Sequence, residues 1–259
     1  MAEFDLSGRV VIITGGNRGI GLGIAEALAR CGCAVCIWGR NEASNQEALA
    51  KLSGLAGASH ARPCDVADPG SVAAAFDATL DRFGRVDGCF ANAGIGGGGR
   101  RAFVDRTPDE WRAMFDINLY GVVHVFQPVL RHMIARAHNG DRFGRLVATS
   151  SLAAVFGTAR NEHYAATKAA INALVRALAV EHARFGITVN AILPGWIKSE
   201  MTAPLMADQK FVGNVMPRIP LRRFGEPADF GGVAVYLMST ASSYHTADCL
   251  TIDGGYSAF

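Results

Sequence analysis

The sequence of 259 residues lacks the patterns that mark membrane, exported and nucleic-acid-binding proteins. No apolar run reaches the roughly 18 residues needed to span a bilayer, and the longest candidate, 171–180, is interrupted by Asn172 and Arg176. The N-terminus carries Glu3 and Asp5 where a signal peptide needs basic residues, and no apolar h-region follows. Lys and Arg number 25 against 23 Asp and Glu, and no basic run with interleaved aromatics appears. We therefore expect a soluble cytoplasmic protein with no nucleic-acid or membrane partner.

A disulfide framework and a metal site are also missing from the pattern. The 6 cysteines fall in strand-like apolar runs, not in a short secreted framework. Cys33 and Cys36 form a C-x-x-C, but in a strand over 33–38 residues three apart point to opposite faces, which predicts buried free thiols. The histidines show no pairing at metal-ligand spacing, so we predict no metal. Three of them, expected on helix surfaces or in packing, are His124, His132 and His182.

No linker, internal repeat or long low-complexity segment divides the chain, so we expect one domain over 1–259. Short apolar runs alternate with helical stretches, and several runs have no polar alternation, which is typical of parallel strands covered by helices on both faces. The expected strands are 9–14, 33–38, 59–64, 86–91, 145–150, 187–193 and 249–252. The expected helices are 19–31, 42–55, 69–83, 107–137, 161–185 and 227–239. The alternation predicts an α/β fold, a Rossmann-like doubly wound and mostly parallel sheet flanked by helices.

Two loops stand out. The glycine run 96–99 follows the fourth expected strand, where loops of such sheets face a ligand, although a merely flexible loop is equally consistent with it. The segment 194–227 has no clear strand and is rich in Met and Pro, and loops of this length in compact domains are usually functional or disordered. We predict a substrate lid over about 198–222 with one or two short helices. Its methionines suit an apolar substrate, and plain packing explains them almost as well.

A strand, a glycine-rich turn and a helix follow one another near the N-terminus. Glycines at 15, 19 and 21 let the backbone turn tightly and approach a pyrophosphate, which a helix N-terminus then binds. The spacing is wider than the commonest G-x-G-x-x-G, but the flanking strand and helix supply the required context. A dinucleotide site is predicted here, and its residues are Gly15, Asn17, Arg18, Gly19, Ile20 and Gly21.

The end of the second expected strand favours NADP(H) over NAD(H), which stays possible. An acidic residue at this position would bind the adenosine ribose of NAD, and the chain has Gly39 and Arg40 instead. With no carboxylate to repel a 2′-phosphate, Arg40 and Arg18 are able to approach one, unless both are simply solvated loop charges. Asp65 and Val66, after the third strand, either meet the adenine or begin the next helix, with Asp65 as its cap.

Tyr164 and Lys168 lie four residues apart on an expected helix, so a phenol and an ammonium face the same place. Ser151 lies thirteen residues before Tyr164. No histidine base is evident beside Ser151, so its hydroxyl is better suited to donate a hydrogen bond to a developing alkoxide than to attack as a nucleophile. A phenol titrates near 10, and lowering its pKa by about two to three units would require a nearby positive charge such as Lys168 or an oxidised nicotinamide.

Taken together, these motifs resemble the short-chain dehydrogenase/reductase family over nearly the whole chain. The matching residues are Thr14-Gly15 through Gly21, Asn92-Ala93-Gly94, Asn118, Ser151, Tyr164, Lys168 and Pro194-Gly195. The resemblance implies one Rossmann-like domain with a seven-stranded sheet, commonly assembled as a tetramer or dimer. It implies that Tyr164 is the acid or base, that Ser151 binds the substrate oxygen, that Lys168 binds the nicotinamide ribose and that Asn118 holds a water. Further cofactor contacts would be Asn92, Ala93, Gly94, Pro194, Gly195, Ile197 and Ser199, the last replacing a common Thr.

The expected activity is interconversion of a ketone or aldehyde and a secondary alcohol, as in a 3-oxoacyl-thioester reductase or a general carbonyl reductase. An NAD-dependent polyol, sugar or hydroxysteroid dehydrogenase is the alternative, and a non-catalytic redox sensor or scaffold is the rival from another class. The expected substrate contacts are Ser151, Ala153, His163, Tyr164 and Trp196. From 169 to 180 only Asn172 and Arg176 are polar, which predicts cover by a partner subunit or by the 107–137 helix.

Overall fold

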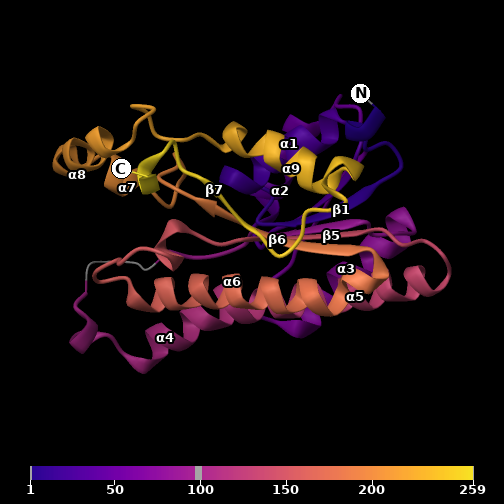
Figure 1. Cartoon of the computed structure of the whole chain (residues 1–259), viewed down its shortest axis with the longest axis horizontal. Helices are drawn as coiled ribbons and strands as arrows, with labels where there is room; N and C mark the ends of the chain where they lie inside the picture. Colours follow the sequence, from indigo (N-terminus) through magenta and orange to yellow (C-terminus); the bar gives the residue numbers. More distant parts are fainter. Residues whose placement is uncertain (1, 97–100, 259) are drawn as a thin grey trace.

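The computed structural model describes residues 2–96 and 101–258, and its centre is a seven-stranded parallel sheet (Figure 1). The strands lie in the order β3-β2-β1-β4-β5-β6-β7, and every paired neighbour is parallel. They are β1 (Val10–Thr14), β2 (Ala34–Trp38), β3 (Ser59–Arg62), β4 (Gly88–Ala91), β5 (Gly144–Thr149), β6 (Ile187–Pro194) and β7 (Cys249–Ile252). The order reverses between β1 and β4, which is where a doubly wound sheet opens its ligand crevice.

Helices cover both faces of the sheet. In Figure 1, α1 and α9 lie above it and α5 and α6 lie below. The helices are α1 (Gly19–Arg30), α2 (Glu42–Leu52), α3 (Pro69–Phe83), α4 (Pro108–Phe115), α5 (Gly121–His138), α6 (Glu162–His182), α7 (Ala203–Met206), α8 (Gln209–Val215) and α9 (Gly231–Met238). No helix within the described part of the chain is long and apolar enough to cross a membrane.

The two faces of the sheet carry separate apolar cores. Alternate residues of each strand enter one core or the other, so β1 sends Ile12 to the side of α5 and α6 and Ile13 to the side of α1 and α9. The same alternation separates the C-x-x-C thiols, because Cys36 lies in the first core and Cys33 in the second. Both are buried and free, which confirms the sequence prediction.

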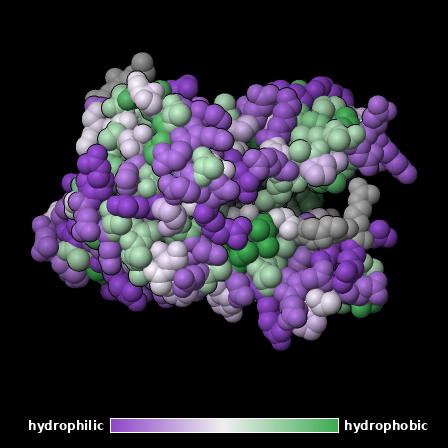
Figure 2. All heavy atoms as spheres, turned by 180° about the vertical axis from the view of Figure 1, so that it is seen from behind, coloured by the Kyte–Doolittle hydropathy of each residue, from purple (hydrophilic) through white to green (hydrophobic). Residues whose placement is uncertain are grey.

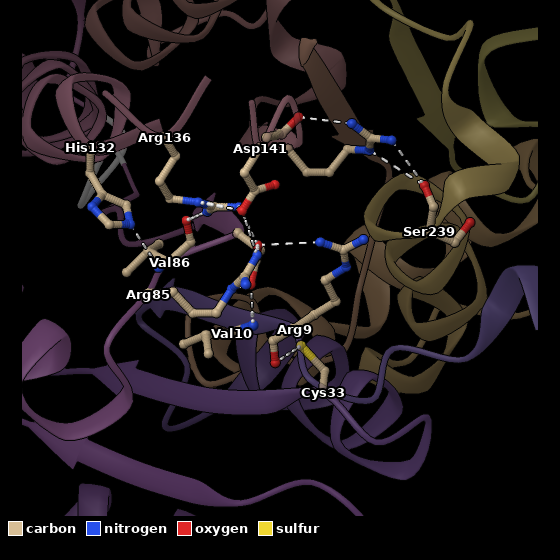
Figure 3. A network of polar contacts seen from close by, with 12 residues as sticks. Arg9, Val10, Cys33, Arg85, Val86, His132, Arg136, Asp141 and Ser239 are labelled. Carbon is tan, nitrogen blue, oxygen red and sulfur yellow. Dashed lines mark hydrogen bonds and ion pairs between the residues drawn. The ribbon is translucent and has the colours of Figure 1, made fainter. Parts of the chain in front are cut away.

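The amino ends of the strands are joined by a network of ionic contacts (Figure 3). Its centre is the fully buried carboxylate of Asp87, which accepts the backbone N–H of Val10 at 2.9 Å and binds Arg85 and Arg136. Both arginines also bind Asp141, whose side chain is 41% exposed. The network ties β1 and β4 to α5 at the edge opposite the ligand crevice, so it supports the fold without entering the site.

The long helix expected over 107–137 is two helices joined by a π-helical turn at Asp116–Tyr120. The segment 198–222, predicted to be a lid, contains the two short helices α7 and α8. Val215 and Ile219 of this segment form a small apolar cluster with Phe224, which follows it. Of the glycine run 96–99, residues 97–99 lie outside the described part of the chain.

Candidate active site

A cleft of about 930 Å³ opens at the carboxyl ends of the strands. The space-filling view shows the surface hollowed on this side of the molecule (Figure 2). All predicted cofactor residues line this cleft except Gly21, which lies beneath the turn, and so do Ser151, Tyr164 and Lys168. Parallel strands bring residues far apart in the chain together here, because their carboxyl ends meet at one edge.

The glycine-rich turn fits a bound pyrophosphate. A Cβ on Gly21 would lie 2.3 Å from the carbonyl oxygen of Gly15, so only glycine lets α1 begin this close to the turn. Gly15 itself has φ +62°, a left-handed conformation that favours glycine. At the start of α1, Arg18 is the N-cap and provides no side-chain hydrogen bond, so the first-turn N–H groups remain available to an anionic ligand.

The turn Asn92-Ala93-Gly94 is held against the end of β1 by Thr14. The Thr14 hydroxyl accepts the N–H groups of Asn92 and Ala93 at 3.0 and 2.9 Å, and the Asn92 amide donates to the Thr14 carbonyl at 3.1 Å. Thr149 of β5 also donates to the Asn92 side chain at 3.1 Å. These bonds fix the floor of the cleft in the middle of the sheet. The role of Thr149 is not visible from the sequence, because nothing marks it among other strand-end residues.

Neighbouring side chains leave no room for a Cβ at Gly39. A Cβ at this position would lie 2.4 Å from Asn17 Nδ2 and 2.5 Å from Asn45 Oδ1. These two side chains bond each other at 2.8 Å, and the buried Asn45 donates to the Gly39 carbonyl at 2.9 Å. Asn45 was missed by sequence reasoning, since a single Asn on a mixed helix gives no signal of burial. The missing acid at position 39 therefore has a steric cause in addition to any effect on cofactor choice.

The charged residues of the cleft are distributed along its length. Arg40 is exposed at the rim, beyond Gly39. Arg18 forms an ion pair with Glu200 of the segment 198–222, and both residues line the cleft. Asp65 accepts the N–H of Ala67 at 3.0 Å and so shapes its own turn. Glu200 was not predicted, and only the tertiary structure brings it to the glycine-rich turn.

Tyr164 and Lys168 meet Ser151 at the deep end of the cleft. Lys168 Nζ donates to the carbonyl of Thr149 at 2.7 Å and lies 5.6 Å from the centre of the Tyr164 ring. Burial lowers the pKa of Lys168 to about 8. Burial also raises the pKa of Tyr164, and a hydrogen bond from Ser151 opposes this only in part. The surrounding protein therefore shifts the phenol pKa upward, because desolvation of the phenolate dominates. The lowering expected from Lys168 or an oxidised nicotinamide stays a prediction.

Asn118 lies fully buried in the π-helical turn between α4 and α5. Its amide accepts the N–H of Ile95 at 2.8 Å and donates to the carbonyl of the same residue at 3.0 Å. A Cβ on Gly94 would lie 3.1 Å from Asn118 Oδ1 and 3.7 Å from Lys168 Nζ, so these two side chains flank one glycine. The side chain of Asn118 thus holds the loop after β4 in place beside the lysine. Such π-helical turns often occur at functional sites.

Three predicted substrate contacts do not line the cleft: Ala153, His163 and Trp196. His163 is 2% exposed, and its ring packs 5.8 Å from that of Trp111 on α4. It precedes Tyr164 on the helix and so points to a different side, which the linear sequence did not reveal. Trp196 packs edge to face against Phe211, with the ring centres 4.9 Å apart, in the apolar cluster of Val215, Ile219 and Phe224. No group of three metal-ligating side chains occurs within residues 2–96 and 101–258.

The cleft combines an uncapped helix N-terminus, a tight glycine turn and a buried phenol–ammonium pair beside a serine hydroxyl. The helix N-terminus and the glycine turn suit the phosphates of a dinucleotide. The phenol–ammonium pair suits proton transfer to or from an oxygen atom. Among the described residues that line the cleft, no histidine lies beside Ser151 to act as its base, so acyl transfer is not favoured. The fold and site define a nicotinamide-dependent oxidoreductase of the CH–OH group.

Comparison with known proteins places the chain in a family. Residues 15–257 match the family model described as "Enoyl-(Acyl carrier protein) reductase". The chain is 37% identical over 253 residues to the 3-oxoacyl-(acyl-carrier-protein) reductase FabG of Chlamydia pneumoniae, with 98% of each chain covered. The chain belongs to the short-chain dehydrogenase/reductase family, and it is an oxidoreductase.

Solved structures agree with this assignment. A short-chain type dehydrogenase/reductase from Mycobacterium marinum superposes with a TM-score of 0.92 at 33% identity, covering 99% of this chain and 98% of the other. A gluconate 5-dehydrogenase from Burkholderia cenocepacia, in complex with NADP and tartrate, has a TM-score of 0.91 at 35% identity, with the same coverage. The predicted α/β fold with a parallel sheet is confirmed.

Proposed function

We propose that the protein is an NADP(H)-dependent reductase of ketones or aldehydes, with Tyr164 as the acid. The observation that carries the proposal is the meeting of Tyr164, Ser151 and Lys168 at the deep end of a cleft whose other end carries the glycine-rich turn and Arg40. The protein raises the phenol pKa, so Tyr164 holds its proton at neutral pH. A protonated phenol supports reduction, in which the carbonyl oxygen must receive a proton.

In this mechanism, bound NADPH supplies the hydride. Ser151 donates a hydrogen bond to the carbonyl oxygen and orients it toward the phenol, and Tyr164 gives its proton to the developing alkoxide. Lys168, with a pKa of about 8, is able to give up and regain a proton near neutral pH. It thereby restores the proton of Tyr164. Lys168 also binds the nicotinamide ribose. Asn118 keeps the loop after β4 beside Lys168, and its predicted contact with a relay water stays a prediction.

The test of Tyr164 is Tyr164→Phe, compared with Tyr244→Phe, whose tyrosine is fully exposed. Removing the phenol proton should lower kcat by about 10²–10⁴ while NADPH binding, followed by nicotinamide fluorescence, stays unchanged. Tyr244→Phe should behave as the wild type. Turnover of Tyr164→Phe near the wild-type level would overturn the mechanism, and a non-catalytic sensor would predict no turnover in any variant.

The preference for NADP(H) rests on Arg40 and on the absence of an acid at Gly39. Arg40→Asp should lower kcat/KM for NADPH about tenfold or more and leave that for NADH equal or higher, because a carboxylate repels the 2′-phosphate. Glu42→Ala, a loss of charge two residues further along, serves as the control. A wild-type enzyme with a higher kcat/KM for NADH than for NADPH would contradict the proposal and favour an NAD-dependent dehydrogenase.

The substrate class stays open between acyl thioesters and sugar acids. The relatives described above are named for both, a 3-oxoacyl-(acyl-carrier-protein) reductase and a gluconate 5-dehydrogenase. We propose that the lid over about 198–222 selects among them, since Met201 and Thr202 near its start line the cleft. A panel of ketones, quinones, sugars and acyl thioesters, assayed by NADPH oxidation, separates these classes.

We also propose a homo-oligomer, a dimer or tetramer, formed through the outer face of α6. The exposed positions Ala169, Ala173, Ala177 and Val180 repeat at helical spacing, and Val180 is 81% exposed. An apolar stripe of this kind is normally covered by another subunit. Sedimentation of Val180→Glu against the wild type tests this, and a wild-type monomer would refute it.

A cytoplasmic location remains the expectation for the chain.

A further inference from the structure

The helix that carries Tyr164 begins without the usual side-chain cap. Tyr164 lies in the first turn of α6, and the N-cap residue Asn161 makes no side-chain hydrogen bond to that turn. Within the described residues, the buried Oδ1 of Asn161 has no hydrogen-bond partner at all. A missing cap costs a helix end about 1 kcal/mol, so something else must hold the start of α6 in place.

The residue before this cap, Arg160, is in a left-handed conformation with φ +64°. For a residue with a Cβ this conformation is unfavourable by about 1 kcal/mol or more, and it persists only where neighbours impose it. Both backbone groups of Arg160 are held. Its N–H donates to Glu162 Oε1 at 2.8 Å, and its carbonyl accepts Nη2 of Arg106 at 3.1 Å.

Arg106, which binds the Arg160 carbonyl, lies 54 residues earlier in the chain. It lies just before α4, its side chain is 1% exposed, and its Nη1 binds Glu110 at 3.3 Å. Burying a guanidinium is costly unless its hydrogen bonds are made. The two Nη groups of Arg106 bind Glu110 and Arg160, while its buried Nε has no partner among the described residues. The planar fork joins Glu110 on α4 to the Arg160 carbonyl at the start of α6.

We infer that Arg106 is a positioning residue for catalysis: by holding the left-handed Arg160, it sets the first turn of α6 and so the place of the Tyr164 phenol. The inference rests on the proposed role of Tyr164. Arg106 is not one of the residues that line the cleft. Its effect passes from Arg160 to Tyr164 through the backbone of the three residues 161–163, and a displacement of about 1 Å of a catalytic group is enough to cost up to 10²-fold in rate.

The chain offers a matched control for Arg106. Arg101 also binds the Glu110 carboxylate, at 3.4 Å, but its side chain is 51% exposed and it makes no bond to Arg160. Arg106→Ala should lower kcat about tenfold or more with the Kd for NADPH unchanged, whereas Arg101→Ala should stay within twofold of the wild type. Amide hydrogen exchange, measured without cofactor, should speed up in peptides covering 158–166 for Arg106→Ala only.

A second change tests the backbone step itself. Glycine adopts the left-handed conformation without strain, so Arg160→Gly should restore most of the kcat lost in Arg106→Ala and change little alone. If Arg106→Ala does not fold, Arg106→Lys, which keeps the charge and loses the fork, takes its place with the same expectations.

Two results would overturn the inference. One is that Arg106→Ala and Arg101→Ala have the same kcat and the same rate of amide hydrogen exchange. The other is that adding Arg160→Gly does not restore the kcat lost in Arg106→Ala. Failure of the proposed function is seen separately, since Tyr164→Phe would then turn over normally whatever Arg106 does.

Discussion

The buried carboxylate of Asp87 is expected to be among the most sensitive single positions for stability. It accepts the Val10 N–H at 2.9 Å, a bond from Arg85 Nε at 2.9 Å and one from Arg136 at 2.8 Å, with Arg9 3.5 Å away. Asp87→Asn keeps the shape and removes the charge, so the amide NH2 would face a guanidinium group, which can only donate hydrogen bonds.

The expected loss in the free energy of unfolding is about 3–5 kcal/mol, the range for breaking one partner of a buried ionic group. Asp141→Asn is the matched control, because Asp141 binds the same Arg85 and Arg136 but is 41% exposed. Water replaces part of its contribution, so a loss of about 1 kcal/mol or less is expected there. Urea unfolding at pH 7, followed by tryptophan fluorescence, measures both changes.

The pH dependence gives an independent check. Burial alone would raise the pKa of Asp87, but hydrogen bonds from Arg85 and the Val10 N–H, with the charges of Arg136 and Arg85, lower it below its ordinary 3.8. A lowered folded-state pKa means that the stabilisation is complete above the unfolded-state pKa and is lost as pH falls through the folded one. The gap between wild type and Asp87→Asn should therefore narrow below about pH 4. Equal losses for Asp87→Asn and Asp141→Asn at pH 7 would refute this reasoning.

Two further outcomes follow from the geometry. Gly21→Ala should weaken NADPH binding at least tenfold, because its Cβ would lie 2.3 Å from the Gly15 carbonyl oxygen. Gly213→Ala on α8 is the control, since a Cβ there meets nothing within 4 Å, and it should leave NADPH binding unchanged. Nicotinamide fluorescence measures both. A thiol reagent should modify the partly exposed Cys31 and Cys249 first and reach Cys33, Cys36, Cys64 and Cys89 only on unfolding, since these four are buried and burial raises the pKa of Cys64 to about 11. Early reaction of Cys36, detected by peptide mass spectrometry, would contradict the burial assigned to it.

The elements of the sheet were predictable because each depends on local pattern. The run 249–252 agrees with β7 at both ends, and the other six strands differ from the expected ranges by one or two residues at their ends. The prediction of one helix over 107–137 was wrong at Asn118, where a single wider turn separates α4 from α5. Apolar periodicity continues through such a turn, so the break leaves no mark in the sequence.

The cofactor residues were predictable for a related reason. Glycines 15 and 21 must be glycine to satisfy a local backbone demand, which a strand–turn–helix context makes visible. His163 and Trp196 show the limit, because both lie beside predicted site residues in the chain and neither lines the cleft. Adjacent residues on a helix point to different sides, and sequence proximity does not tell which side faces the ligand.

The sequence by itself determined the order of strands and helices, the glycine-rich turn, and the one-turn spacing of Tyr164 and Lys168, because all of these are set within a few residues along the chain. The tertiary structure alone decided which distant groups surround them. The Thr149 carbonyl accepts a hydrogen bond from Lys168, Glu200 pairs with Arg18, and Arg106 binds the Arg160 carbonyl. It also decided the direction of the phenol pKa, since desolvation depends on everything packed around a group and not on its neighbours in sequence.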